Sequence, residues 1–157
     1  MSPIQQMLLG VGAVATKTYV DDIFSTYLWA GSGSARSINN SVDMTEGGMT
    51  WIKKRSNSDR NVITDTVRGV TKQLFTERSD GESTESDNIT SFNNNGFSLD
   101  TDNRVNESGA TYSSWTFRKS PMFDVVTYTG NGNLRTIAHS LGSVPGCIMI
   151  KCTSQAQ

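Results

Sequence analysis

The chain has 157 residues, enough for one ordinary domain and a fragment of a second. Its net charge of −1 gives no general positive field for nucleic acid or anionic lipid, so we expect neither nucleic acid nor a membrane surface as a partner. Hydrophobic residues make up 35% of the chain, and an excess of Ser, Thr, Asn and Gly predicts many short strands joined by turns, hence a mainly β protein.

Residues 1–15 carry no charged side chain, and Gly10 and Gly12 interrupt their apolar content. This stretch has no sustained helical or strand period, so we expect a peptide that docks on a partner or stays mobile. It imitates a secretory signal, but Gln5 and Gln6 stand where such a signal has Lys or Arg, which argues against secretion. No stretch of the sequence approaches the roughly 20 apolar residues of a membrane helix.

Helical spacing follows this peptide. One apolar face has the spacing i, i+3, i+4, i+7 and i+8: Val20, Ile23, Phe24, Tyr27 and Leu28. The pattern predicts a short amphipathic helix from about Tyr19 to Thr26, within a helix and linker region at residues 16–28. The apolar face of this helix packs either on the chain's own β domain or against a neighbouring chain, and the sequence leaves both open.

Strand patterns dominate from Tyr27 onward. Short runs rich in β-branched or aromatic residues predict strands at residues 49–55, 61–66, 89–92, 96–100, 112–119 and 123–129. Asn95-Gly96 and Asn131-Gly132 favour tight hairpins because both residue types tolerate positive φ. Only residues 66–77 suggest a helical turn, and the acidic loop 79–88 is expected to be exposed. The pattern predicts a β-sandwich or jelly-roll-like module at residues 29–120.

A pattern early in the chain returns late in it. Several residues recur 99 positions later, in the order Gly31/Gly130, Gly33/Gly132, Arg36/Arg135, Ile38/Ile137 and Ser41/Ser140. After one residue of slippage, Gly48, Ile52 and Lys53 recur as Gly146, Ile150 and Lys151. A sequence with an internal repeat is interpreted as an array. Residues 121–157 are therefore predicted to begin a second, truncated β module.

No pattern in the sequence indicates catalysis or a metal. Acidic residues gather at 80–87 and 100–102, but neither run has EF-hand spacing, so we expect solvated loop acids and no metal site. The single histidine, His139, precedes Ser140, and adjacent residues rarely face each other as base and nucleophile. No spacing selects a carboxylate pair of the kind a glycosidase needs. We expect no enzyme activity and no cofactor.

The three tryptophans, Trp29, Trp51 and Trp115, are the candidates for stacking on sugar rings. Trp51 and Trp115 lie in predicted strands beside other apolar residues, which favours a place in the core. The basic group at residues 53–55 is expected to form a solvated strand end.

Cys147 and Cys152 stand in a short apolar run. On an extended strand they would lie about 16 Å apart, too far for a disulfide. We interpret them as two small buried hydrophobic residues rather than a redox or metal pair.

Four runs of the sequence carry a resemblance to a known family. They are "KTYVDDIFSTYLWAGSGSARSINNSVDMTEGGMTWIKKRS", "DTVRGVTKQLFT", "ITSFNNNGFSL" with "YSSWTFRK", and "FDVVTYTGNGNLRTIAHSLGSVPG". Together they resemble virion structural proteins of marine tailed phages, especially cyanobacterial ones, in which modules of this kind recur in tail-fibre and other tail-associated proteins. The resemblance covers nearly everything from Lys17 to Lys151 and includes no catalytic motif.

The resemblance implies the N-terminal region of a tail fibre, assembled in the cytoplasm of the bacterial host and located in the virion tail. The start "MSPIQQMLLGVG" is similar to the short apolar N-termini by which phage fibres plug into a tail, here into adaptor, nozzle or baseplate proteins. Six residues would make that contact: Pro3, Ile4, Gln5, Met7, Leu8 and Leu9. A homotrimer is implied, for which the predicted helix offers four interface residues: Val20, Ile23, Phe24 and Tyr27.

Two other functions remain open from the sequence. One is a carbohydrate-binding β-sandwich, on the virion or secreted, which requires aromatic rings exposed in a groove. The other is a fragment of a depolymerase, against which the missing carboxylate pair is the main objection. In the tail-fibre hypothesis, host surface glycans are reached only through distal regions.

Overall fold

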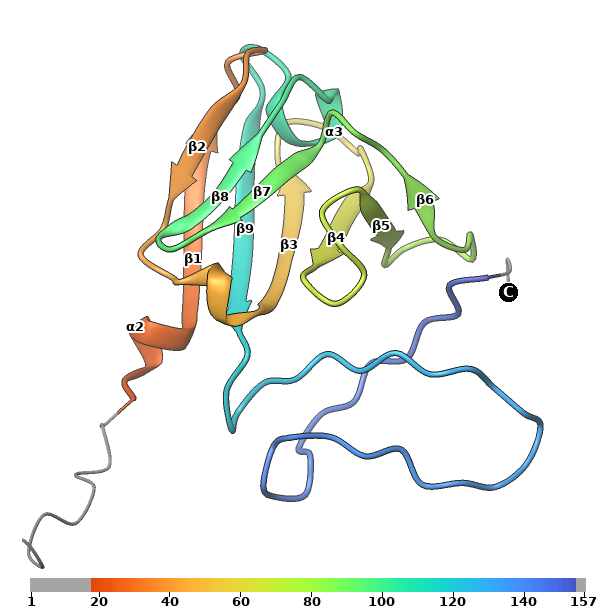
Figure 1. The fold of residues 1–157 in the computed structure, drawn as a ribbon. Coiled ribbons are helices and arrows are strands. Elements are labelled where there is room, and N and C mark those ends of the chain that lie inside the picture. The colour runs from red at the N-terminus through yellow and green to blue at the C-terminus, as the bar shows by residue number, and fades with distance from the viewer. Residues whose placement is uncertain (1–17, 155–157) are drawn as a thin grey trace, which may run out of the picture.

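The computed structural model describes residues 18–154, which form two facing antiparallel β-sheets with short helical turns at their ends (Figure 1). The helical turns are α2 (Val20–Ile23), η1 (Met44–Glu46) and α3 (Asn103–Asn106). The strands are β1 (Phe24–Ala30), β2 (Arg36–Asn39), β3 (Gly48–Lys54), β4 (Asn61–Asp65), β5 (Lys72–Phe75), β6 (Ser83–Thr84), β7 (Ile89–Asn93), β8 (Gly96–Leu99) and β9 (Thr111–Arg118). The predicted mainly β class is confirmed.

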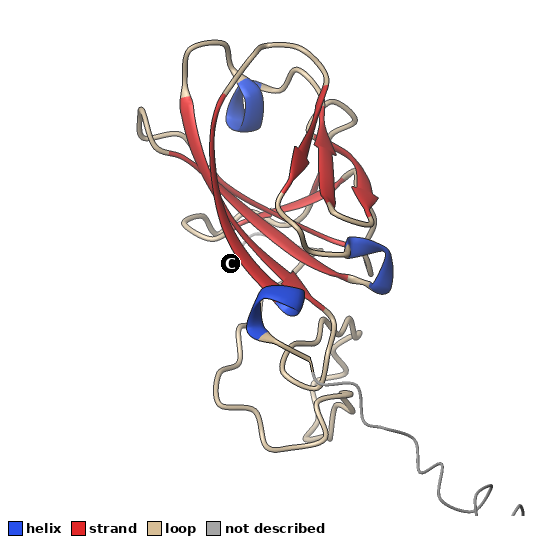
Figure 2. Ribbon diagram, turned by 90° about the vertical axis from the view of Figure 1, so that its left-hand side faces the viewer, coloured by secondary structure: helices blue, strands red, loops and turns tan. Residues whose placement is uncertain are grey.

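The larger sheet has six strands in the order β1-β9-β3-β4-β5-β6, and the smaller has three in the order β2-β8-β7. Figure 2 shows the smaller sheet packed over one face of the larger. Both sheets contribute to one buried core, composed of Trp29, Ile38, Ile52, Val62, Phe75, Ile89, Phe97, Leu99, Val105, Ala110 and Tyr112. The other face of the six-stranded sheet is called the outer face below.

The period-2 alternation of strands decides which side chains enter the core. On β3, Ile52 is fully buried against the smaller sheet, so its neighbours Trp51 and Lys53 point to the outer face. The strand register gives the neighbouring strands the same two faces, because Ile52 lies opposite Val62 of β4 and Ser114 of β9. The alternation pattern and the strand pairing therefore assign the same side chains of the central strands to the core.

The hairpin between β7 and β8 confirms the turn predicted at Asn95-Gly96, one residue earlier than expected. Asn93 pairs with Gly96, so the loop residues are Asn94 and Asn95. Gly96 has a φ of 142°, and a Cβ there would lie 2.0 Å from the carbonyl oxygen of Ile38 on β2. Only glycine allows β2 and β8 to approach this closely.

The predicted helix at residues 19–26 is largely wrong. α2 is a single turn that ends at Ile23, and Phe24, Tyr27 and Leu28 belong to β1. All seven β1 residues pair with β9, from Phe24 opposite Phe117 to Ala30 opposite Thr111. An isolated two-turn helix is marginal in water, so continuous pairing with a central strand overrides the helical spacing.

One further prediction is confirmed, and two others are corrected. Residues 66–77 hold the single helical turn that the sequence suggested and no longer helix: the Gly69 amide donates to the Asp65 carbonyl at 3.0 Å, and the Asp65 side chain accepts from the amides of Val67 and Arg68 at 3.0 and 2.9 Å. Residues 123–129 form no strand, and Asn131-Gly132 makes no hairpin. From Lys119 to Ser154 the only strand-like contact is a bridge between Ser120 and Phe123.

Candidate assembly surfaces

Large apolar side chains are exposed in two separate parts of the described chain. Thirteen are exposed in all, and twelve of them lie toward the two ends of the described chain: Tyr19, Val20, Tyr27 and Leu28; then Met122, Val126, Tyr128, Leu134, Val144, Ile148, Met149 and Ile150. Between these groups only Val67 is exposed. The middle of the described chain thus presents few large apolar groups, and the candidate contact surfaces lie on α2 and β1 and in the residues after β9.

The first group, here called the N-terminal surface, lies on α2 and β1. Tyr19 begins this turn, and its amide donates to the Asp22 carboxylate at 2.7 Å, which closes the first helical turn. β1 is an edge strand of the six-stranded sheet and has no charged residue, proline or glycine along its seven residues. Edge strands usually carry such groups as protection against pairing with other chains.

The four residues predicted at an oligomer interface divide into two pairs. Val20 and Tyr27 are exposed, at 65% and 36%, and remain available for a contact between chains. Ile23 is buried, and Phe24 packs on Phe117 of β9 with ring centroids 4.9 Å apart. Ile23 and Phe24 therefore serve the chain's own fold. The residues predicted to dock into a tail, within 3–9, lie outside the described residues.

The second group belongs to residues 121–154, here called the C-terminal segment. Figure 1 shows it as a long irregular loop at the same end of the sandwich as α2. Phe123 stacks on Phe117 at 4.9 Å, and near the far end the amide of Glu82 donates to the carbonyl of Thr153 at 2.8 Å. The segment is thus attached to the sheet at both ends.

A cleft of about 1600 Å³ opens between the C-terminal segment and the outer face. The sheet side of this cleft is apolar, with Phe24, Met49, Trp51, Ile63, Leu74 and Phe117 among its lining residues. The other side is lined by much of residues 122–130 and 145–154. The segment therefore leaves a wide apolar space above the sheet.

Trp51 and Trp115 do not lie in the core as predicted, and Trp29, also a candidate for stacking on sugars, is buried. Trp29 is buried in the core, where it stacks on Tyr112 with centroids 5.4 Å apart, and its indole nitrogen donates to the carbonyl of Val105 at 3.2 Å. Trp51 and Trp115 are half-buried side by side on the outer face, with centroids 5.7 Å apart. The sequence could not predict this position, because alternation divides the side chains of a strand between two faces of the sheet but does not show which face is covered by the second sheet.

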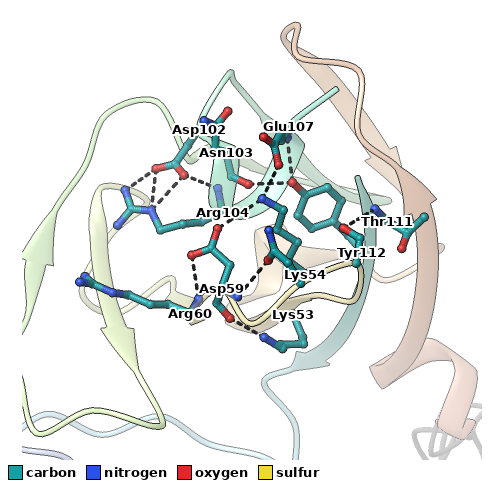
Figure 3. Close-up of polar contacts among 12 residues, drawn as sticks. Lys53, Lys54, Asp59, Arg60, Asp102, Asn103, Arg104, Glu107, Thr111 and Tyr112 are labelled. Carbon is teal, nitrogen blue, oxygen red and sulfur yellow. Dashed lines mark hydrogen bonds and ion pairs between the residues drawn. The ribbon is translucent and has the colours of Figure 1, made fainter. Parts of the chain in front are cut away.

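A polar network occupies the opposite end of the sandwich, around α3 (Figure 3). Lys54, expected to be solvated, is only 2% exposed; its ammonium forms ion pairs with Glu107 and, at 3.4 Å, with Asp59. The Tyr112 hydroxyl accepts from the Glu107 amide at 2.8 Å and donates to the Asn103 carbonyl at 2.7 Å. Burial lowers the pKa of Lys54, but its acidic partners outweigh that effect and raise it above its ordinary value.

The acidic loops come together beside this network. Carboxylate oxygens of Glu85, Asp87 and Asp102 lie within 4.8 Å of one another. Arg104 already neutralises part of this group, since it pairs with Asp102 and, at 3.4 Å, with Glu85. The hydrogen bonds that the Arg104 guanidinium donates to the Asp102 carboxylate raise the pKa of Arg104. A basic residue in the middle of the group makes it an ion-pair network rather than a cation site.

The loop at 79–88 is less exposed than predicted. Glu82 is half-buried and pairs with Arg68 at 3.1 Å and with Lys72 at 3.4 Å. Asn88 is fully buried. These contacts fold the loop onto β5, which the polar composition of the loop could not reveal.

His139 and Ser140 have different partners. The His139 ring nitrogen Nδ1 accepts from the Leu141 amide at 3.2 Å, whereas the Ser140 hydroxyl donates to Asp124 at 2.9 Å. Burial works against ionisation of Asp124, but the hydrogen bonds from Ser140 outweigh it and lower the pKa of that carboxyl. Cys147, predicted to be buried, is exposed. The geometry thus offers no base and nucleophile pair at this histidine.

The described fold is a mainly β module with apolar segments before and after it. No helix among residues 18–154 is long and apolar enough to cross a membrane. Residues 20–157 match the family model "Domain of unknown function (DUF7483)", and the chain belongs to that family. No curated protein matches the chain, and no solved structure does.

Proposed function

We propose that this chain is a structural component of a bacteriophage virion, the N-terminal region of a tail fibre that anchors the fibre to the tail. The observation that supports it best is the distribution of exposed apolar side chains. Between residues 30 and 118, Val67 is the only large apolar side chain that is exposed. A domain that acts as a spacer in a fibre needs a polar surface over most of its body and apolar contact surfaces where it joins its neighbours. The resemblance to tail-associated phage proteins adds the biological setting.

The two flanking surfaces lie at the same end of the sandwich. Because β1 and β9 are antiparallel, the chain enters at Phe24 directly opposite the point near Phe117 where it leaves. In the proposed fibre the sandwich would therefore project sideways from the axis, while the flanking segments follow that axis. In the proposed homotrimer, the N-terminal surface of each copy would then lie close to those of its neighbours.

The anchoring role is tested by deleting residues 2–15. We expect fibres to be absent from purified virions, because several apolar peptides held together by an oligomer would convert weak docking into stable attachment. The melting temperature of the β module should stay nearly unchanged, since the core consists of residues from 29 to 112. Virions that still carry the fibre after this deletion would refute the docking role.

The association between copies is tested separately on the N-terminal surface. The double variant Tyr27→Ser, Leu28→Ser removes two exposed apolar groups, and Val67→Ser is the matched control because it removes one outside both surfaces. We expect light scattering to show a lower mass for the double variant only. Equal masses for all three proteins would contradict an interface at β1.

A second candidate function, carbohydrate binding, is favoured by one observation: Trp51 and Trp115 form a half-buried pair on the outer face, and Trp51 lines the cleft. Aromatic faces of this kind can stack on sugar rings. Titration with bacterial surface polysaccharides should then quench tryptophan fluorescence in the wild type and not in Trp51→Ala, Trp115→Ala. No response from any polysaccharide in the wild type would exclude this candidate.

A further inference from the structure

A line of polar side chains crosses the core side of the six-stranded sheet. Its members lie on five adjacent strands: Thr116 on β9, Thr50 on β3, Thr64 on β4, Gln73 on β5 and Ser83 on β6. The first four are fully buried, and Ser83 is half-buried. These five residues are called the polar row below.

The strand register aligns the polar row. Thr50 lies directly opposite Thr116 on one side and Thr64 on the other, and Gln73 lies opposite Ser83. Gln73 stands beside Thr64, because it continues the antiparallel register of β4 and β5 by one pair. Directly opposite residues have Cβ atoms roughly 4.5–5.5 Å apart. The five side chains therefore form one continuous line of polar groups.

The polar row borders the apolar core. Thr50, Thr64 and Gln73 each stand two residues from a core residue of the same strand, and alternate residues of a strand share a face. The core residues concerned are Ile52, Val62 and Phe75. The segment after β2 lies against one end of the row, since the Asn40 side chain donates to the Thr116 hydroxyl at 2.7 Å. The row is thus enclosed within the sandwich.

Most polar atoms of the row have no hydrogen-bond partner among residues 18–154. They are the hydroxyl oxygens of Thr50, Thr64 and Ser83 and both amide atoms of Gln73, and all five atoms are buried. Removing such a group from water without a replacement hydrogen bond is costly, and native proteins rarely leave one unpaired. Five of these atoms in one line therefore indicate a ligand that lies between them.

The chemistry of the five atoms identifies the ligand as water. None of them carries a charge, so nothing in the row balances an ion. The hydroxyls both donate and accept, and the Gln73 amide offers an acceptor oxygen beside a donor nitrogen. A cation would meet the donors of that amide and an anion would meet its oxygen, whereas water matches both. A buried water makes about three hydrogen bonds, so five atoms require about two molecules.

We propose that the polar row is a buried water-binding site, in which about two ordered water molecules bridge Thr50, Thr64, Gln73 and Ser83. One bridge joins the central strands β3 and β4 through Thr50 and Thr64. Gln73 and Ser83 extend the site toward the edge strand β6, where the half-buried Ser83 lies nearest to solvent. The waters supply the hydrogen bonds that the protein does not. The inference does not depend on the virion role.

Relaxation dispersion of ¹⁷O-labelled water tests the site directly, because it detects long-lived waters and does not respond to the exchange of hydroxyl protons. The double variant Thr50→Val, Thr64→Val removes both hydroxyls with little change of side-chain shape. We expect it to hold about one or two long-lived waters fewer than the wild type. The control Thr26→Val, Thr111→Val makes the same changes at two exposed threonines and should lose none. An equal count in the wild type and the first double variant would overturn the proposal.

The sign of a stability change gives a second test. If water binds the Thr64 hydroxyl, Thr64→Val leaves that water with one partner fewer, and the melting temperature should fall by roughly 2–8 °C. If the interior is dry, the same change removes an unpaired polar group, and the melting temperature should rise. A rise would therefore refute the site. A fall in Thr64→Val without any loss of ¹⁷O dispersion would show that the hydroxyls bond to each other directly, which also refutes it.

Discussion

Replacement of Trp29 gives the sharpest test of the two faces of the six-stranded sheet. Trp29 is 7% exposed, packs between Tyr112 and Phe97, and donates a hydrogen bond to the carbonyl of Val105. Trp115 has the same side chain on a neighbouring strand but is half-buried on the outer face. The same substitution at the two positions should therefore have different effects on the free energy of unfolding.

The magnitudes follow from burial. Truncation of a buried Trp to Ala costs about 3–5 kcal/mol, and the carbonyl of Val105 loses its partner, so Trp29→Ala should lie at the upper end of that range. Trp115→Ala should cost less, about 2 kcal/mol, because Trp115 is partly exposed and its side chain lies outside the core. Trp29→Phe keeps one aromatic ring in the core but loses the hydrogen bond and some buried volume, at about 1–2 kcal/mol.

Denaturant unfolding followed by circular dichroism measures all three free energies. Trp29→Ala should be the most destabilising of the three, and Trp115→Ala and Trp29→Phe should both cost clearly less. If Trp115→Ala destabilised the protein as much as Trp29→Ala, Trp115 would be buried as deeply as the core, and our account of the outer face would be refuted.

The remaining predictions concern the polar network and the β7–β8 hairpin. Glu107→Gln should destabilise the protein by about 1–2 kcal/mol, because the buried Lys54 keeps its charge but loses its closest partner. The pKa of Lys54 is raised in the folded protein, so the stability from its ion pairs is present below its ordinary pKa of about 10.4 and is lost as the pH rises above that value. A pH series of melting temperatures should show that loss in the wild type. The loss should be smaller in Glu107→Gln. Gly96→Ala should prevent the close approach of β2 and unfold the hairpin. Gly69→Ala should cost only about 1 kcal/mol, because a Cβ there has open space and the cost is only the backbone strain of a φ of 99°. Equal melting temperatures for the two glycine variants would contradict the contact with β2.

The sequence alone determined the strands whose patterns are local. β3, β4, β7, β8 and β9 lie within one or two residues of the predicted ranges, because β-branched and aromatic runs between turn residues favour extended backbone wherever they stand. The β7–β8 hairpin and the repeat were also readable from the residue types and their order.

Long-range contacts decided the rest. Phe24–Ala30 has helical spacing but becomes β1, because it lies beside β9, which is about 90 residues later in the chain. Residues 123–129 have a strand pattern but stay irregular, because no strand among residues 18–154 pairs with them. A strand's pattern is a property of its own residues, whereas its partner comes from elsewhere in the fold.

For the candidate contact surfaces too, the sequence predicted the residue types, and the tertiary structure decided their exposure. The spacing of Val20 and Tyr27 correctly indicated apolar residues, but only the tertiary structure revealed that both are exposed while Ile23 and Phe24 are enclosed. It also buried Lys54, which the sequence placed in solvent, and it placed Trp51 and Trp115 on the outer face. Alternation says that a strand has two faces; which face is covered depends on where the second sheet packs, and that is decided by contacts distant in sequence.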